Sequence, residues 1–200
     1  MTTEVSRSPE HPIADFFIKR WSPRSFSGAP LDQNTLFRLF EAARWAPSAY
    51  NSQPWRFVYS LRESPSWSRF LGLLSEKNQR WAANASALVF LVSKTLLRSN
   101  DGQEATPLTT HSFDAGAAWA SLAFQAEHLG LKVHAIGGFD RDRAKDLLEV
   151  PDDYKIEIVI AIGYQSSPDQ LPDDLRAREL PSQRHPLALL VAEERFRFTE

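Results

Sequence analysis

The stretch from Arg44 to Phe57 constrains this chain most, because it changes from a helical to an extended pattern within a few residues. Apolar residues at helical spacing follow Asp32, a favourable N-cap, and predict a helix of about four turns that ends near Pro47. These apolar residues are Leu36, Leu39, Phe40 and Ala43. Beyond Pro47, apolar residues alternate with polar ones, which predicts a half-buried strand over residues 55–61.

The loop between this helix and this strand covers Ser48 to Gln53 and is rich in hydroxyl and amide groups. Apolar elements hold both of its ends, so its polar groups can face a planar polar ligand. Asn, Ser and Pro are also the residues that ordinary turns use. The residues alone therefore leave two interpretations open, a ligand-contacting loop and a plain helix-to-strand turn.

Composition indicates one globular domain without a nucleic-acid partner. A chain of 200 residues that is 42% hydrophobic can bury a substantial core, so we expect one domain over residues 1–200, with a loosely held start at 1–11. A formal charge of −2 provides no basic field for nucleic acid. The chain contains no cysteine and no pattern that predicts a metal site. With no signal-like opening and no run of 18 apolar residues, we expect a cytoplasmic protein that does not contact membranes.

Apolar patterns predict the remaining helices and strands. Helices are expected over Pro12–Lys19, from Ser64 and Pro65 onward with Trp67, Phe70, Leu71 and Leu74 buried, over Ser112–Leu129 with Gly130 as its stop, and after Asp140. Strands are expected over Ala87–Val92, Leu131–Ile136 and Ile156–Ile162, the first as a central strand. Polar stretches predict a mobile, lid-like loop over Leu97–Thr110 and an entirely extended connection over Ser166–Pro186.

Three polar residues after the first predicted helix form a basic cluster, Arg20, Ser22 and Arg24. Guanidinium groups meet phosphate oxygens bidentately and a hydroxyl adds one more donor, so the cluster suits a phosphate. A solvated basic patch at the end of a helix is the alternative. His111, at the start of the long helix, is either a proton donor or ligand contact, or an ordinary surface residue.

Gly137 and Gly138 directly follow a predicted strand and precede Asp140, a candidate N-cap. Without side chains, the backbone there can lie against a ligand and offer N–H groups, and a plain turn is the alternative. The chain lacks G-x-G-x-x-G and the Walker pattern, so no separate nucleotide site of either type is predicted. The apolar residues 187–191 near the end of the chain need a covering surface, either their own domain or a second subunit.

Four of these features together closely resemble the nitroreductase family of flavin enzymes. They are R-x-S-x-R at residues 20–24, A-P-S-A-Y-N-S-Q-P-W-R-F at residues 46–57, I-G-G-F at residues 136–139, and Arg184 before Pro186. The match in order and spacing extends from about Ile13 to Val191. The resemblance implies an α+β fold with a central, mostly antiparallel sheet flanked by helices. It also implies a homodimer whose extended C-terminal arm, residues 187–200, reaches the partner.

The resemblance further implies FMN at the dimer interface. Arg20, Ser22 and Arg24 match family residues that bind the FMN phosphate and ribityl chain and reach the pyrimidine edge, and Arg184 matches a late phosphate-binding residue. The segment that the other subunit contributes is matched by Pro47, Ser48 and Asn51, with Gln53 beside it. The turn near the flavin ring is matched by Gly137 and Gly138, and Gly137 stands where well-known bacterial members carry a glutamate.

The activity implied by the resemblance is hydride transfer from NADH or NADPH to a small-molecule acceptor, such as a nitroaromatic or a quinone. The flavin carries the chemistry, so no catalytic side chain is assigned, and one shared pocket implies ping-pong turnover. Two alternatives stay open. One is a different reductive reaction on the same fold, such as dehalogenation or ring oxidation or reduction, and the other is a flavin-binding dimer without turnover.

Overall fold

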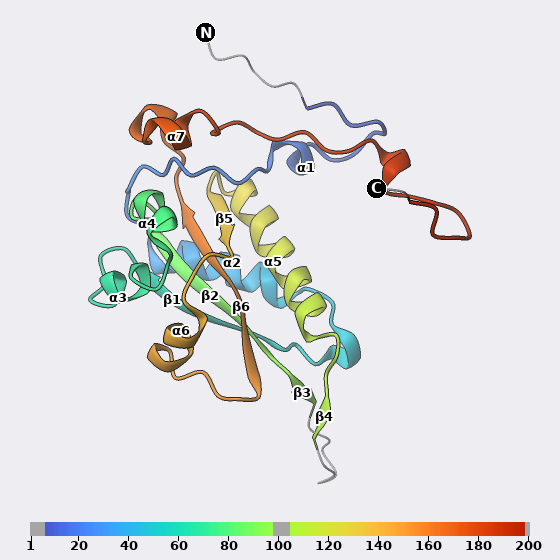
Figure 1. The fold of residues 1–200 in the computed structure, drawn as a ribbon, viewed down its shortest axis with the longest axis horizontal. Coiled ribbons are helices and arrows are strands. Elements are labelled where there is room, and N and C mark those ends of the chain that lie inside the picture. Colours follow the sequence, from blue (N-terminus) through green and yellow to red (C-terminus); the bar gives the residue numbers. More distant parts are fainter. Residues whose placement is uncertain (1–6, 98–104, 199–200) are drawn as a thin grey trace.

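The structure is a computed structural model that describes residues 7–97 and 105–198 (Figure 1). Its helices are α1 (Asp15–Lys19), α2 (Gln33–Arg44), α3 (Trp67–Leu71), α4 (Glu76–Ala82), α5 (His111–His128), α6 (Arg141–Leu147) and α7 (Asp173–Arg176). Short 3-10 turns are η1 (Ala49–Asn51), η2 (Pro168–Gln170) and η3 (Leu187–Leu189). The strands are β1 (Trp55–Leu61), β2 (Ala87–Lys94), β3 (Leu96–Leu97), β4 (Thr106–Pro107), β5 (Lys132–Ile136) and β6 (Tyr154–Gly163).

Four of the strands form one antiparallel sheet in the order β1-β2-β6-β5. Residues 87–93 of β2 are all buried, which confirms the prediction of a central strand covered on both faces. β5 lies at one edge of the sheet, and β3 pairs with β4 in a separate small ribbon. Antiparallel strands between helical layers confirm the predicted α+β fold class.

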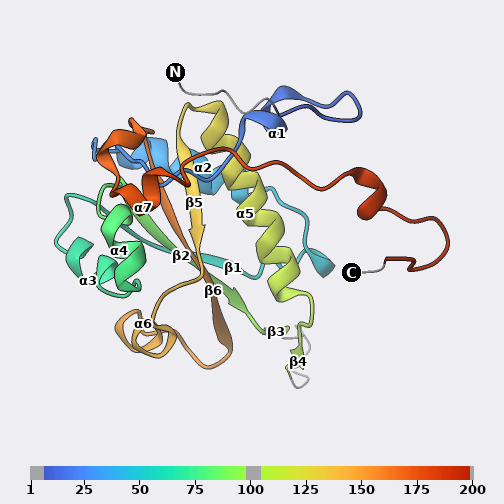
Figure 2. The same cartoon turned by 45° about the horizontal axis from the view of Figure 1, so that its top comes forward.

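Helices cover both faces of the sheet (Figures 1 and 2). On one face, α2 and α5 bury Leu39 and Leu122 against Val89 of β2. On the other face, Trp81 of α4 packs in a second apolar cluster with Phe90. Because successive residues of a strand point to opposite faces, the continuous apolar run of β2 serves both clusters.

The ends of the two long helices agree with the predictions. The Asp32 carboxylate accepts the Thr35 backbone N–H at 2.9 Å and caps α2. At the end of α5, Gly130 has a φ of 71°, and the Leu131 N–H donates to the Ala126 carbonyl at 2.8 Å. This reverse turn favours glycine because its left-handed backbone strains other residues.

The predicted helix opening at Ser64 and Pro65 is wrong, because α3 begins at Trp67. The Ser64 hydroxyl donates to the Leu61 carbonyl at 2.8 Å, so it closes a turn instead of capping a helix. Leu74 is buried as expected but lies beyond α3, where it forms an isolated β-bridge with Phe139.

The entirely extended connection predicted for residues 166–186 is also wrong, since η2 and α7 interrupt it. Pro172 is the N-cap of α7, a position where its missing N–H is not needed. The loosely held start over residues 1–11 stays a prediction, and within it the Arg7 side chain donates to the backbone carbonyls of Ile18 and Arg20. Residues 1–6, and residues 98–104 of the predicted lid, lie outside the described residues.

The chain after α7 passes close to α1 and continues beyond the body of the molecule (Figures 1 and 2). Leu189, Leu190 and Val191 are exposed there. Their need for a covering partner stays a prediction. Among the residues that the structure describes, no helix has the length and apolar character needed to cross a membrane.

Candidate functional site

The segment that contains Arg20, Ser22 and Arg24 leaves α1 in an extended conformation and runs beside the residues that follow β6. The Ser166 N–H donates to the Ser25 carbonyl, and the Ser27 N–H donates to the Tyr164 carbonyl, both at 2.9 Å. Sheet-like bonds of this kind hold a backbone in one conformation. The basic cluster is therefore attached to the central sheet.

A buried carboxylate holds the same segment from another direction. Glu179, just after α7, is only 3% exposed, and its Oε1 accepts the backbone N–H groups of Arg24 (2.6 Å) and Ser25 (2.8 Å). Its Oε2 lies 3.9 Å from Nη1 of Arg24 and has no hydrogen-bond partner among the described groups. Glu179 thus orders both the backbone and the charge of Arg24.

His134 supports the segment from β5. Its Nδ1 lies 2.9 Å from the Pro23 carbonyl, so Nδ1 carries a proton and donates, and its ring packs 4.6 Å from Trp81. Burial lowers the pKa of His134 to about 4, against the opposing effect of the Pro23 bond, and the charges of Arg24 and Arg20 lower it further. His134 is a neutral support at neutral pH.

Arg20 and Arg184 interact electrostatically although they are 164 positions apart in the chain. Burial lowers the pKa of the Arg20 guanidinium, and the positive charge of Arg184 lowers it further, which places the two cations within electrostatic reach. Arg20 Nη1 also donates to the Ser22 hydroxyl at 3.3 Å. Arg184 is exposed and bonds to the backbone and hydroxyl of Ser182. The structure thus gathers the predicted phosphate ligands at one end of the molecule.

The two glycines differ in what surrounds them. A β-carbon on Gly138 would lie 2.7 Å from Nδ2 of Asn78, so a side chain there would displace the Asn78 amide that donates to the Gly138 carbonyl. A β-carbon on Gly137 would meet only Ile158, at 4.0 Å. Gly138 therefore has a packing role that the sequence did not indicate, whereas Gly137 presents open backbone.

The loop over Ser48–Gln53 is held mostly by its own bonds. The Gln53 N–H donates to the Ser48 hydroxyl (3.0 Å), and the Gln53 side chain donates to the Asn51 carbonyl (3.0 Å). Its one described tie to a distant residue is the bond from the Ala49 N–H to the buried carboxylate of Asp114, at 3.3 Å. Pro47, Asn51 and Gln53 are exposed. The backbone is strained, with φ of 53° at Tyr50, 51° at Asn51 and 45° at Gln53.

Within a single chain, the loop over Ser48–Gln53 lies far from the basic cluster of Arg20, Ser22 and Arg24. Asp114, which contacts the loop, lies in the first turn of α5, whereas Glu127, whose charge acts on Arg20, lies in its last turn. At 1.5 Å per residue, the two carboxylates are roughly 20 Å apart along the helix. Figures 1 and 2 agree, with η1 beside one end of α5 and α1 at the other.

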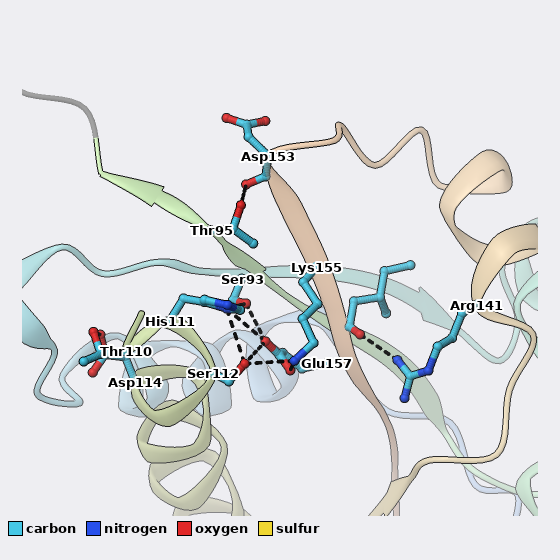
Figure 3. A network of polar contacts seen from close by, with 11 residues as sticks. Ser93, Thr95, Thr110, His111, Ser112, Asp114, Arg141, Asp153, Lys155 and Glu157 are labelled. Carbon is cyan, nitrogen blue, oxygen red and sulfur yellow. Dashed lines mark hydrogen bonds and ion pairs between the residues drawn. The ribbon is translucent and has the colours of Figure 1, made fainter. Parts of the chain in front are cut away.

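His111 belongs to a network at the start of α5 (Figure 3). The Glu157 carboxylate accepts the hydroxyls of Ser93 (2.6 Å) and Ser112 (2.7 Å), and Lys155 lies 2.9 Å from its other oxygen. His111 Nδ1 is 2.7 Å from the Ser93 hydroxyl and 3.2 Å from Glu157, and its side chain is 17% exposed. His111 is therefore a partly buried network member, and the surface alternative is wrong.

A β-bulge brings Glu157 into this network. Leu91 pairs with Ile158 and Val92 with Ile156, so Glu157 is the extra residue of β6. Burial raises the pKa of Glu157, but hydrogen bonds from Ser93, Lys155 and Ser112 outweigh burial and hold it below its ordinary value. The carboxylate therefore stays ionised and organises the surrounding donors.

Sequence patterns missed Glu179 and His134 as supports of the cluster. Glu179 stands among charged residues of a polar connection, and its bonding partners are 154 and 155 positions earlier in the chain. Sequence spacing carries no signal for such a pair. No group of three or more potential metal-ligating side chains occurs within residues 7–97 and 105–198.

Comparisons with known proteins agree on one family. The sequence model of the Nitroreductase family matches residues 18–65 and 60–164. A putative NADH dehydrogenase/NAD(P)H nitroreductase of Streptomyces coelicolor is 27% identical over 186 residues, which cover 84% of this chain and 92% of the relative. A crystal structure of an oxidoreductase containing FMN is 48% identical, with full coverage of both chains and a TM-score of 0.95. A putative nitroreductase of Desulfovibrio desulfuricans, solved in complex with FMN, is 23% identical, with coverage of 94% and 100% and a TM-score of 0.70.

Proposed function

The chain belongs to the nitroreductase family, and from this premise we propose that it is an FMN-dependent oxidoreductase. It transfers hydride from NADH or NADPH to a small acceptor such as a nitroaromatic or a quinone. The observation that carries this proposal is the basic cluster of Arg20, Ser22 and Arg24, which long-range bonds hold beside β5. The 48% identical solved relative that contains FMN adds support.

The donor set suits a phosphorylated flavin. Arg20, Ser22, Arg24 and Arg184 offer charged and hydroxyl donors for a phosphate, and Gly137 leaves backbone open beside Ile158. His134, which supports the cluster, and Gly137 are three residues apart, about 10 Å along an extended strand. One elongated ligand can therefore contact both features. Gly138 follows Gly137 and shapes the turn through its packing on Asn78.

The complete site is proposed to need two chains. Pro47, Ser48, Asn51 and Gln53 lie roughly 20 Å along α5 from the cluster of the same chain, so they are assigned to the flavin of a partner subunit. The exposed apolar residues near 187–191 support a homodimer in which the arm over 187–200 covers the partner. The shared sheet of the two apolar clusters supports one domain over residues 1–200 in each subunit.

Bound FMN would supply the hydride chemistry, accepting a hydride from NADH or NADPH and passing it to the acceptor. The protein would bind the flavin, orient it and shield it from water. Arg20 and Arg24 neutralise the phosphate, and Glu179 orients Arg24 through the backbone. Since the chain contains neither G-x-G-x-x-G nor the Walker pattern, reductant and acceptor are proposed to use one pocket in turn, which gives ping-pong kinetics.

Anaerobic spectroscopy of the purified protein tests this function. The preparation should be yellow, NADH or NADPH should bleach the flavin absorbance, and a nitroaromatic or quinone should restore it. Steady-state rates should then give parallel double-reciprocal lines. A flavin that neither reductant bleaches would indicate a binding dimer without turnover. Intersecting lines would contradict the shared pocket and leave the flavin assignment intact.

A further inference from the structure

Arg7 lies next to the proposed phosphate ligands although it precedes the first helix. Its Nη1 donates to the backbone carbonyls of Ile18 (2.5 Å) and Arg20 (3.0 Å). A guanidinium has five N–H donors, and among the described residues the contacts of Arg7 use Nη1 alone. Its other two nitrogens therefore keep donors for a ligand while Nη1 anchors the side chain.

Arg7 and Arg184 also line one pocket of about 410 Å³, together with Phe17 and Ile18. The N-terminal segment and the C-terminal arm form this pocket, and Glu10 Oε1 accepts the Leu187 N–H at 2.9 Å to hold them together. The pocket thus brings two arginines from opposite ends of the chain to the same place.

Positive charge in this region exceeds negative charge. Burial lowers the pKa of Arg7 and the charge of Arg184 lowers it further, and Arg7 in turn acts on Arg20. The acidic residue that acts on Arg20 is Glu127, which already pairs with Lys132 at 2.7 Å. Glu10, the carboxylate that lines the pocket, accepts the Leu187 N–H, and like charges that outnumber carboxylates are unfavourable until an anion binds. A phosphate monoester, with close to two negative charges, fits this arrangement.

We propose that Arg7 is a further ligand of the cofactor phosphate and completes a three-guanidinium subsite with Arg20 and Arg184. This inference rests on the proposed function. Arg7 lies outside residues 18–164 that match the family model, so the assignment comes from this chain's own contacts. Phe17 and Ile18 line the same pocket beside Arg7 and Arg184.

The test compares FMN with riboflavin, which lacks the phosphate. Flavin-free wild-type protein and the Arg7→Ala variant are titrated with each ligand, and binding is followed by quenching of flavin fluorescence. Arg7→Ala should weaken FMN about tenfold or more and leave riboflavin affinity unchanged. Arg7→Lys keeps a point charge, so its FMN affinity should lie between those of wild type and Arg7→Ala. Arg38→Ala, which removes an exposed charge from α2, should match wild type.

Unchanged FMN affinity in folded Arg7→Ala, or an equal loss for riboflavin, would overturn the assignment. If wild-type protein bound neither FMN nor riboflavin, that result would contradict the proposed function itself, and with it the assignment of Arg7 as a cofactor ligand. Thermal unfolding supplies a second readout without flavin. Inorganic phosphate should raise the melting temperature of wild type more than chloride of equal ionic strength does, and Arg7→Ala should lose most of that difference. An equal phosphate shift in both proteins would contradict the proposal.

Discussion

The segment from Arg20 to Phe26 and the segment from Pro47 to Gln53 carry most of the proposed flavin contacts, yet they are held differently. Distant residues hold the first segment: Glu179 binds two of its N–H groups, and His134 binds the Pro23 carbonyl. The second segment bonds mainly within itself and is tied to α5 through Asp114.

This difference indicates which half of the site a single chain can complete. Long-range bonds leave the first segment ordered before any ligand arrives, which lowers the entropy cost of binding. The second segment holds strained backbone in an exposed loop, where Tyr50 is 87% exposed. Contacts from a partner subunit and a ligand would offset that strain.

The largest expected effect comes from Glu179→Ala. The substitution leaves the N–H groups of Arg24 and Ser25 without their acceptor in a buried place, which should lower the free energy of unfolding by about 3 kcal/mol or more. Urea unfolding of the flavin-free protein measures the loss. Glu179→Gln keeps an acceptor oxygen, so its free energy of unfolding should fall clearly less than that of Glu179→Ala. Equal stability of Glu179→Ala and wild type would refute a stabilising role of the Glu179 bonds to Arg24 and Ser25.

Acid should also lower the free energy of unfolding, because His134, which supports the first segment, becomes protonated. Its folded pKa of about 4 lies below the ordinary 6.5, so the unfolded chain takes up a proton that the folded chain rejects. The stabilisation is complete above pH 6.5 and is lost as the pH falls toward 4, by about 3 kcal/mol. Urea unfolding at several pH values should show this drop, and His134→Gln should reduce it. Identical pH dependence in the two proteins would exclude His134 as its source.

Mixed dimers test whether the two segments serve one flavin from different chains. Arg24→Ala should weaken FMN about tenfold or more, because a charge-assisted hydrogen bond is worth about 1.5–3 kcal/mol. Asn51→Ala should damage the other half of the site. Heterodimers of the two variants contain one doubly damaged and one intact site, so activity should recover in part. Heterodimers that form without recovering activity would argue for sites built from one chain.

The smallest effect is expected for Tyr50→Gly. Glycine adopts a φ near 53° without strain, and the exposed ring buries little, so relief of strain and the greater freedom of the unfolded chain nearly cancel. The free energy of unfolding, measured in urea, should change by less than about 1 kcal/mol. Tyr50→Ala retains the strain and serves as the comparison. A loss above about 2 kcal/mol in Tyr50→Gly would show that packing, not local bonding, holds the loop.

Local patterns were sufficient for much of the fold. Asp32 caps α2, Gly130 ends α5 and the apolar run of β2 forms the central strand, because capping, chirality and alternation act within a few residues. The same patterns failed at Ser64, whose hydroxyl bonds locally to Leu61 instead of capping α3. They also failed in the connection that contains α7, whose four residues are too few for a periodic signal.

The sequence by itself determined the elements, their order, and the residue types that suit a phosphate and a flavin, because those properties are carried by short runs of the chain. Only the tertiary structure decided that Arg184 lies within electrostatic reach of Arg20, that Glu179 binds the Arg24 N–H, and that a bulge turns Glu157 toward His111. These contacts join residues far apart in the chain. Their geometry depends on how the sheet and helices pack, and no local pattern encodes it.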